Sequence, residues 1–369
     1  LRVHTKDYLE EFKALSEVDG GLLGLRTPFA RDGFDIASLS SGLAMSAIKD
    51  VLKGKHKNSY SLSRPPGHHC LPDYPNGFCL LANIAIAIES AISENLAKKF
   101  CVIDWDVHHG NGTEAIFYDR PDVLTISVHQ ERNYPVDTGQ ETDRGKGKGI
   151  NHNINLPLPA GSGHDTYLDL FDRVISPLVN NYRPDIIIVA CGFDAAMIDP
   201  TSSMLCSAET FRILTRKAQI LADKNCNSRL SLIHEGGYSE VYVPFCGHAV
   251  LEELSAEYKL GVLTNGNADV NKLGIGHLFD FSISSMDVKS NKPGRAHYVK
   301  AHELSQVDFK NTLHVGDHPV NDIVGARELG INTMWFNLNN LNWEVDENPP
   351  IQFNSWSQFI NLVESSYGS

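Results

Sequence analysis

The chain has 369 residues and a formal net charge of −13, so it can form one large α/β domain or two domains, each with a sizeable core. The acidic balance argues against a protein that binds the phosphate backbone of nucleic acids, because the one basic cluster, residues 144–148, is short and lies among glycines. There is no apolar run of membrane-spanning length and no signal-peptide pattern. We expect a soluble protein that binds neither nucleic acid nor membranes, in an oligomeric state that the sequence leaves open.

The cysteines indicate a reducing compartment. Their number is odd, they form no C-x-x-C pair, and several lie inside apolar runs. A disulfide framework would need pairs, so we expect reduced thiols and a cytoplasmic protein. The cysteines are Cys70, Cys79, Cys101, Cys191, Cys206, Cys226 and Cys246.

In the first two thirds of the chain, short apolar runs alternate with helical patterns. Such alternation predicts a mostly parallel sheet with helices on both faces. The helical patterns include residues 77–97, with Ile84, Ile88 and Ile92 at helical spacing, and residues 167–181. The expected strands are residues 59–62, 100–103, 123–128, 153–156, 186–190 and 230–233.

Short polar segments follow four of these expected strands. They are residues 64–69, 104–110, 192–194 and 234–238. Because ligands collect at the carboxyl ends of parallel strands, we expect these four segments to meet at one rim of the sheet.

Two carboxylates and two imidazoles follow directly after the strand at residues 100–103. On an extended chain alternate side chains point the same way, so Asp104, Asp106 and His108 would lie on one side and His109 on the other. Carboxylate and imidazole ligands without a thiolate suit a zinc or iron site that stays open to water. A strand end with satisfied hydrogen bonds is the alternative interpretation of this segment alone.

The polar segments together supply the parts of an amide hydrolase. Three metal ligands would leave a coordination position for water. His68 and His69 could take the proton of that water and protonate the leaving amine, and Tyr238 could donate its hydroxyl to the developing oxyanion. The three expected metal ligands are Asp106, His108 and Asp194.

These segments resemble the histone deacetylase and acetylpolyamine amidohydrolase family, most closely its bacterial class II branch. The resemblance covers Leu1 to about Leu254 and implies an arginase-like α/β fold with a zinc site, and the ligand chemistry leaves Fe²⁺ as the alternative ion. The substrate would be an acylated lysine, and an acetylpolyamine or another small acyl amine is the alternative. The matching segments are residues 64–69, 77–80, 104–113, 192–200 and 235–238.

The resemblance also implies roles for further residues. Asp104 and Asn111 would orient the paired histidines, and Tyr238 indicates an active deacetylase. The substrate channel would be lined by Gly77, Phe78 and Tyr134. A monovalent cation, K⁺, would bind at Asp104, Asp106, His108, Ser127 and Val128, mostly through backbone oxygens.

The chain departs from this family at two places. Cys70 replaces the usual small residue after the paired histidines, which we expect to affect packing only. The chain begins at Leu1 in a helical pattern, residues 3–15, and we expect the family's first strand and early loop to be missing upstream. Other polar residues are expected to be structural: His129, His152, His164, the strand-entry residue Asp185 and the turn former Asp199.

A second α/β pattern follows residue 255, with expected strands at residues 259–263, 312–315 and 333–336. This part resembles the carboxyl-terminal half of the haloacid dehalogenase-like phosphatases, which have a Rossmann-like fold. That family needs an Asp-x-Asp nucleophile on its central strand, and residues 247–260 supply none, so we expect no phosphatase activity and doubtful Mg²⁺ binding. The matching vestigial residues are Thr264, Lys292, Asp317 and Asp322.

The join between the two patterns suggests a fusion. Residues 251–255 fit both the end of the deacetylase-like part and the start of the phosphatase-like part. We expect a deacetylase-like domain, 1–254, truncated at its amino terminus, and an incomplete phosphatase-like module, 255–369. Two genes joined by recombination or by sequence assembly would give this pattern, and an inactive truncated fusion is an alternative to an active enzyme.

Overall fold

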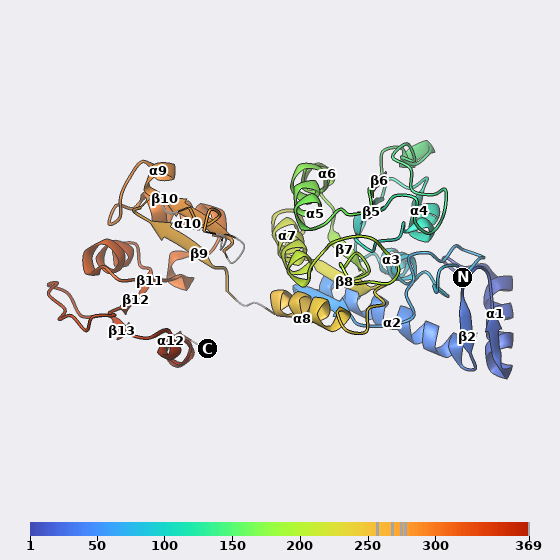
Figure 1. The fold of residues 1–369 in the computed structure, drawn as a ribbon, viewed down its shortest axis with the longest axis horizontal. Coiled ribbons are helices and arrows are strands. Elements are labelled where there is room, and N and C mark those ends of the chain that lie inside the picture. Colours follow the sequence, from blue (N-terminus) through green and yellow to red (C-terminus); the bar gives the residue numbers. More distant parts are fainter. Residues whose placement is uncertain (256–257, 267–268, 274–275, 277–278, 368–369) are drawn as a thin grey trace. The chain divides into compact units, whose positions relative to one another are not determined.

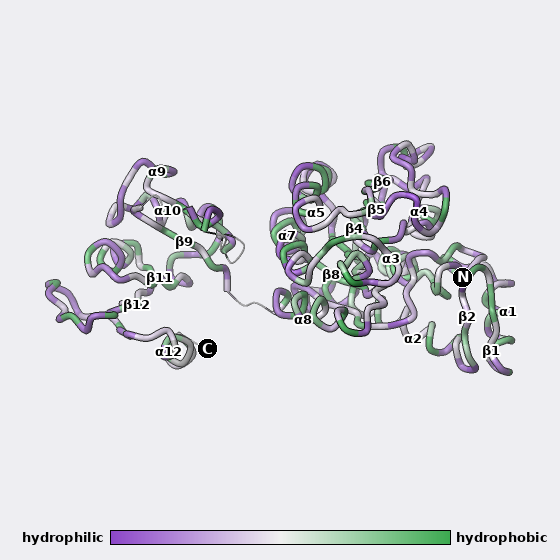
Figure 2. The backbone as a smooth tube through the Cα atoms, viewed as in Figure 1, coloured by the Kyte–Doolittle hydropathy of each residue, from purple (hydrophilic) through white to green (hydrophobic). Residues whose placement is uncertain are grey.

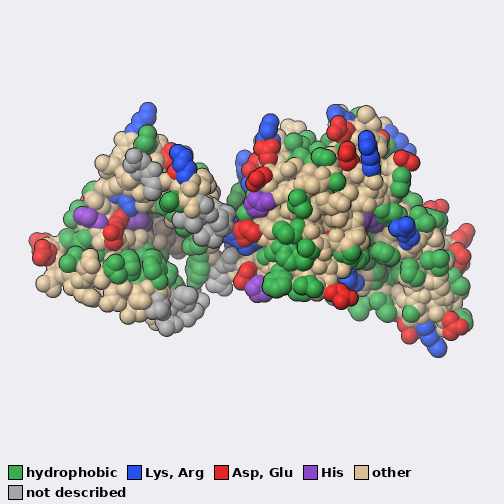
Figure 3. All heavy atoms as spheres, viewed as in Figure 1, with side chains coloured by type: hydrophobic (Ala, Val, Ile, Leu, Met, Phe, Trp, Pro, Cys, Tyr) green, Lys and Arg blue, Asp and Glu red, His purple; other side chains and the backbone are tan. Residues whose placement is uncertain are grey.

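The computed structural model describes residues 1–369 apart from 256–257, 267–268, 274–275, 277–278 and 368–369 (Figure 1). The chain divides into two compact units, Leu1–Ser255 and Ala256–Ser369. No helix in the described part is long and apolar enough to span a membrane. On the face of the first unit in Figure 3, acidic and basic side chains are interspersed.

The first unit is built on a six-stranded sheet in the order β3-β8-β7-β4-β5-β6. Every neighbouring pair in this sheet is parallel, which confirms the predicted parallel α/β architecture. The strands are β3 (Asn58–Ser61), β4 (Phe100–Asp104), β5 (Val123–Gln130), β6 (Asn153–Leu158), β7 (Ile186–Cys191) and β8 (Leu230–His234). A two-stranded antiparallel hairpin, β1 (Gly20–Leu22) and β2 (Pro28–Ala30), precedes them.

Helices cover both faces of this sheet, and two hydrophobic cores result. On β4, Cys101 and Ile103 pack into one core, and Phe100 and Val102 pack into the other. This alternation follows from the period of two along a strand, and Figure 2 shows the hydrophobic strands inside the unit. The helices are α1 (Lys6–Val18), α2 (Gly33–Leu52), α3 (Asn83–Ser93), α4 (Asn111–Phe117), α5 (His164–Leu170), α6 (Ser176–Tyr182), α7 (Ala208–Cys226) and α8 (Val243–Leu254).

Two predicted helices have different bounds in the structure. The pattern at 77–97 yields a helix only from Asn83 to Ser93, because Gly77 and Phe78 have positive φ angles of 51° and 65°. The pattern at 167–181 belongs to a longer helical run, in which a π-helical turn, Phe171–Ile175, joins α5 to α6.

The second unit contains two separate parallel sheets, β10-β9 and β11-β12-β13. Within the described residues, β9 and β11 do not pair with each other. Strands near the three predicted positions are present, and β10 and β13 were not predicted. The elements are β9 (Gly261–Thr264), β10 (Phe281–Ser284), α9 (Ser285–Val288), α10 (Ala296–Ser305), β11 (Leu313–Gly316), α11 (Gly325–Arg327), β12 (Asn332–Phe336), β13 (Ile351–Phe353) and α12 (Trp356–Tyr367).

Candidate active site

The four polar segments meet at the carboxyl ends of β3, β8, β7 and β4, which are neighbours in the sheet. Hydrogen bonds join segments that are far apart in sequence. The N–H of Val107 donates to Oδ1 of Asp194 at 2.8 Å, and the N–H of Gly236 donates to Oδ2 of Asp106 at 2.7 Å. The predicted rim is therefore present.

Asp106, His108 and Asp194 form a buried group whose possible ligand atoms all lie within 4.8 Å of one another. Nδ1 of His108 lies 3.1 Å from Oδ1 of Asp106 and 3.0 Å from Oδ2 of Asp194. The prediction that strand alternation brings Asp106 and His108 together was wrong in its reason, because β4 ends at Asp104. The two side chains meet in the loop, where the N–H of His108 also donates to Oδ1 of Asp106 at 2.9 Å.

The charges of this group suit a cation. Burial and the charge of Asp106 raise the pKa of Asp194 to about 7. Burial opposes a charge on His108, but its hydrogen bonds to Asp106 and Asp194 raise its pKa to about 10. The carboxylates of Asp106 and Asp194 share one neighbouring imidazole, that of His108. The group therefore favours binding of an additional positive charge.

The shape of the group also fits a metal ion. A Cβ at Gly192 would lie 2.2 Å from Oδ2 of Asp106, and a Cβ at Gly236 would lie 2.2 Å from Oδ2 of Asp194, so only glycine leaves room for the carboxylates. The ligands of a tetrahedral zinc ion are about 3.3 Å apart, close to the separations of the His108 nitrogen from the two carboxylates. Two carboxylates and one imidazole can thus hold Zn²⁺ or Fe²⁺.

The paired histidines have the partners that were expected. Nδ1 of His68 lies 2.9 Å from Oδ2 of Asp104, and Nδ1 of His69 lies 2.8 Å from Oδ1 of Asn111. Burial lowers the pKa of His68, but the charges of Asp106 and Asp104 outweigh it and hold that pKa well above its usual value. Burial and the neighbouring His68 charge hold the pKa of His69 well below its usual value. The two environments therefore favour the cationic form of His68 and the neutral form of His69.

The residues expected in the substrate channel surround these groups. The ring of Tyr134 stands perpendicular to the ring of His69, with centroids 5.2 Å apart, and the ring of Phe78 lies 5.8 Å from that of Tyr238. Gly77 lies between two rings, because a Cβ there would come within 2.5 Å of His69 and 2.7 Å of Tyr134. Burial raises the pKa of Tyr238, so its hydroxyl keeps its proton.

Asp199 does more than the turn formation expected of it. Its Oδ1 accepts the N–H of Thr201 at 2.9 Å, as a turn former would. Its Oδ2 accepts the N–H groups of Tyr238 at 2.7 Å and Ser239 at 3.2 Å, and the side chain is 6% exposed. Asp199 therefore holds the backbone that carries Tyr238, and its place inside the matching segment 192–200 was the only sequence signal for this.

Glu235 and Arg64 also contact the site without having been assigned a role. Oε2 of Glu235 accepts the N–H groups of Gly67 and His68. Nη2 of Arg64 donates to the carbonyl of Gly237 at 2.9 Å, and its guanidinium lies 5.9 Å from the centroid of the Tyr238 ring. Burial raises the pKa of Glu235 to about 7.

Several residues proposed for the monovalent cation lie next to one another. Asp104 on β4 is opposite Ser127 on β5 in the parallel register, and both are buried. Val128 is also buried, and a cavity of about 10 Å³ adjoins Asp104 and Ser127. The hydroxyl of Ser127 lies 3.0 Å from Nδ1 of His129, so it already has a partner.

The residues expected to be structural have structural contacts. His129 also lies 3.0 Å from the carbonyl of Gly139, and His164 lies 2.9 Å from the hydroxyl of Thr210. Asp185 accepts the N–H groups of two lysines just before β4, which confirms the strand-entry role. His152 is bonded to the carbonyl of Ile150. All seven cysteines are buried and free, including Cys70.

In the second unit, two of the four vestigial residues are in contact. Nζ of Lys292 lies 2.6 Å from Oδ1 of Asp322 and donates to the carbonyl of Leu263 at 2.8 Å. Thr264 ends β9, and its hydroxyl accepts the N–H of Gly266. Asp317 follows β11 directly, and its carbonyl accepts the indole N–H of Trp335 at 2.9 Å.

Residues 1–254 match the family model described as a histone deacetylase domain. The chain belongs to the histone deacetylase family. A histone deacetylase-like amidohydrolase of Pseudomonas aeruginosa is 50% identical over 255 residues, which are 69% of this chain and 67% of that protein. A probable deacetylase of Archaeoglobus fulgidus is 36% identical over 256 residues, 69% of this chain and 70% of that protein.

Solved structures of the family have the same fold. The crystal structure of the HDA15 HD domain has a TM-score of 0.64 and 32% identity, and the match covers 68% of this chain and 71% of that one. The acetylpolyamine aminohydrolase of Burkholderia pseudomallei has a TM-score of 0.62 and 26% identity, with 69% and 81% covered. The chain is thus a member of a hydrolase family of deacetylases and amidohydrolases, which generally depend on a metal.

Residues 213–336 match a second family model, described as a haloacid dehalogenase-like hydrolase. This match confirms the second resemblance. It begins within α7 and overlaps the deacetylase match over residues 213–254.

Proposed function

We propose that the first unit catalyses the metal-dependent hydrolysis of an acyl amide such as acetyl-lysine. The observation that carries this proposal is the buried group of Asp106, His108 and Asp194 beside two paired histidines. An acetylpolyamine or another small acyl amine is the alternative substrate, because relatives named for both chemistries are similar to this chain.

Asp106, His108 and Asp194 would hold the metal ion. Zn²⁺ or Fe²⁺ bound there would polarise the acyl carbonyl and lower the pKa of a water molecule. The remaining chemistry is proton transfer and charge stabilisation, which side chains of this chain would supply. K⁺ at Asp104, Ser127 and Val128 remains part of the proposal as a structural cation.

His69 would be the general base. Its Nδ1–H donates to the amide oxygen of Asn111, so Nε2 is left with a lone pair to accept a proton from water. His68 donates from Nδ1 to the Asp104 carboxylate, and its cationic form would supply the proton that the leaving amine needs. The two rings are 3.9 Å apart between centroids, so both can reach one scissile bond.

Tyr238 would stabilise the developing oxyanion. Its hydroxyl keeps its proton, and hydrogen bonds from its backbone to Asp199 fix its position. The rings of Phe78 and Tyr134 would flank the aliphatic part of an acylated lysine or polyamine.

The test is hydrolysis by zinc-loaded protein of an acetyl-lysine peptide and of an acetylpolyamine, beside the variants Asp106→Asn and Tyr238→Phe. Loss of a metal ligand or of the oxyanion donor should lower kcat by roughly 100-fold or more. Equal turnover by wild type and both variants would contradict the zinc mechanism. Turnover of neither substrate by wild type would favour the inactive fusion.

We propose that the second unit, residues 255–369, is an incomplete phosphatase-like module without catalytic activity. Lys292 is neutralised by Asp322, and no residue in 247–260 can supply an Asp-x-Asp nucleophile. Full-length protein with Mg²⁺ should therefore not hydrolyse p-nitrophenyl phosphate above background. Turnover that Lys292→Ala abolishes would overturn this proposal.

We also propose that the two modules were joined by a gene fusion at about residue 254. The test is amplification of source genomic DNA across the codons for residues 240–270. A clean product of the expected length supports a natural fusion, and its absence supports an error of assembly.

A further inference from the structure

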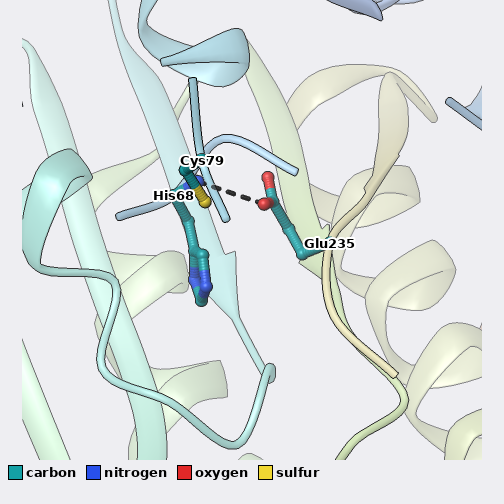
Figure 4. A group of neighbouring side chains, drawn as sticks. All are labelled: His68, Cys79 and Glu235. Atoms are coloured by element: carbon teal, nitrogen blue, oxygen red, sulfur yellow. Dashed lines mark hydrogen bonds between the residues drawn. The ribbon is translucent and has the colours of Figure 1, made fainter. Parts of the chain in front are cut away.

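The paired histidines stand on a loop whose backbone is held by buried side chains. The N–H groups of Gly67 and His68 both donate to Oε2 of Glu235, at 2.7 and 3.1 Å. The next N–H, that of His69, donates to Sγ of Cys79 at 3.5 Å. Figure 4 shows the Glu235 carboxylate directed at the backbone nitrogen of His68, while the imidazole extends away from it.

The other side of the same loop is anchored as well. The carbonyl of His68 accepts the N–H groups of Gly112 at 2.9 Å and Thr113 at 3.1 Å, at the start of α4. Glu235 is therefore the acceptor that completes the anchoring of His68 on its amide side. A buried N–H without an acceptor costs free energy. Loss of the Glu235 oxygen would therefore destabilise the present conformation of the loop.

His68, Cys79 and Glu235 could also be seen as a second metal site, because their ligand atoms lie within 4.8 Å of one another. Their present contacts argue against an ion. Nδ1 of His68 is bonded to Asp104, and Oε2 of Glu235 is used by two N–H groups. Burial also holds the pKa of Cys79 well above its usual value, so the thiol is not available as a thiolate.

The loop after β3 is tied to the loop after β8 at two points. Glu235 binds residues 67–68, and Arg64 donates to the carbonyl of Gly237 at 2.9 Å. The first loop carries the paired histidines and the second carries Tyr238. The two contacts thus set the distance between the proton-transfer groups and the oxyanion donor.

We propose that Glu235 is a positioning residue for the hydrolysis, which holds the His68–His69 loop against the Gly236–Tyr238 turn through the position of its Oε2 rather than through its charge. The inference rests on the proposed function. Glu235 is fully buried, and its second oxygen, Oε1, has no hydrogen-bond partner in the described part of the protein. The carboxylate therefore serves through one oxygen only.

Two substitutions separate position from charge. Glu235→Gln keeps an acceptor oxygen at the same reach and removes the charge, whereas Glu235→Asp keeps the charge and withdraws the oxygen by one methylene. We expect kcat per metal-loaded site to stay within about threefold of wild type for Glu235→Gln and to fall roughly 10- to 100-fold for Glu235→Asp. KM should change by less than about threefold in both, because neither variant alters the residues that flank the substrate.

Glu253 supplies the matched control. It is a buried carboxylate on α8 that binds Arg212 and Arg216, outside the active site. Glu253→Gln should lower the midpoint of thermal unfolding and leave kcat per metal-loaded site unchanged. Metal content and unfolding midpoint are measured for every variant, so that loss of folded enzyme is not counted as loss of turnover.

The outcomes are distinct. Wild-type turnover by Glu235→Asp, or an equal loss in Glu235→Gln and Glu235→Asp, overturns the positioning role while leaving the proposed function intact. Wild-type protein that hydrolyses neither acetyl substrate overturns both. A loss in Glu235→Asp that Glu235→Gln does not share, with KM unchanged, supports the inference.

Discussion

Gly77 lies between the rings of His69 and Tyr134 and has a φ of +51°. Gly77→Ala should push both rings apart and strain the backbone, lowering kcat about 10-fold or more and stability by about 1–3 kcal/mol. Gly54→Ala is the control, because φ there is +72° and no described atom lies within 4 Å of the added Cβ. It should cost about 1 kcal/mol without loss of kcat, as measured by denaturant unfolding and turnover. Equal kinetic effects of the two substitutions would contradict this account.

His234 should make the first unit sensitive to acid. Burial and the charge of Arg64 lower its pKa to about 4, whereas the unfolded value is about 6.5. Between these values the unfolded chain binds a proton that the folded chain does not, so stability falls as pH decreases from about 6.5 to 4. The shift corresponds to about 3 kcal/mol, at about 1.4 kcal/mol per pKa unit.

The comparison that isolates this effect is His234→Gln, which can still bind the hydroxyl of Tyr60, now 3.1 Å from Nδ1 of His234. Urea unfolding of both proteins at several pH values gives the two stability curves. The difference between them should change with pH only in the window from about 4 to 6.5. Parallel curves would show that His234 is not the group responsible.

Single residues also show how far sequence reasoning reaches. His68, His69, Asp106 and His108 follow predicted parallel strands, so their meeting at one rim could be predicted, although strand alternation was the wrong reason for placing Asp106 beside His108. Glu235 and the second function of Asp199 could not, because each accepts backbone N–H groups from a segment distant in sequence. Such contacts leave no periodicity or spacing, since any residue except proline can donate a backbone N–H.

The start of helix α7 is determined by a local capping signal in the sequence. Ser207 accepts the N–H of Thr210 and donates its own N–H to the Thr210 hydroxyl, which forms a capping box. Ser207→Ala should lower the stability of the first unit by about 1 kcal/mol and leave kcat per metal-loaded site unchanged. Ser176→Ala, inside the α5–α6 helical run, should have almost no effect on unfolding. An equal loss in both would argue against the cap.

Strand positions were easier to predict than helix bounds. The central strands β4, β7 and β8 are short, largely apolar runs in which every residue is buried, whereas the edge strands β3 and β6 are only partly buried. The helical pattern at 77–97 failed at its start because the turn at Gly77 and Phe78 is required beside the active site. The positive φ angles of Gly77 and Phe78 therefore exclude a helix there despite the local apolar pattern.

At the level of the whole chain, the two units differ in the size of their cores. The first has extended hydrophobic cores on both faces of a continuous sheet. The second has a small core around Tyr298, Ala326 and Ile331, and β9 and β11 lie at the ends of two separate sheets without pairing within the described residues. Open strand edges and limited burial reduce stability, so the second unit should unfold first.

Metal binding should therefore act on only one of two unfolding transitions. Zinc at 100 times its Kd stabilises the state that binds it by about 2.7 kcal/mol, or roughly 5–10 °C for a unit of about 250 residues. Scanning calorimetry of full-length protein after removal of metal with dipicolinate, and after addition of zinc, should show the upper transition move and the lower one stay. In Asp106→Asn, which lacks one of the proposed ligands, the zinc-dependent shift should disappear. A shift of the lower transition, or one that persists in Asp106→Asn, would place the stabilising ion away from Asp106, His108 and Asp194.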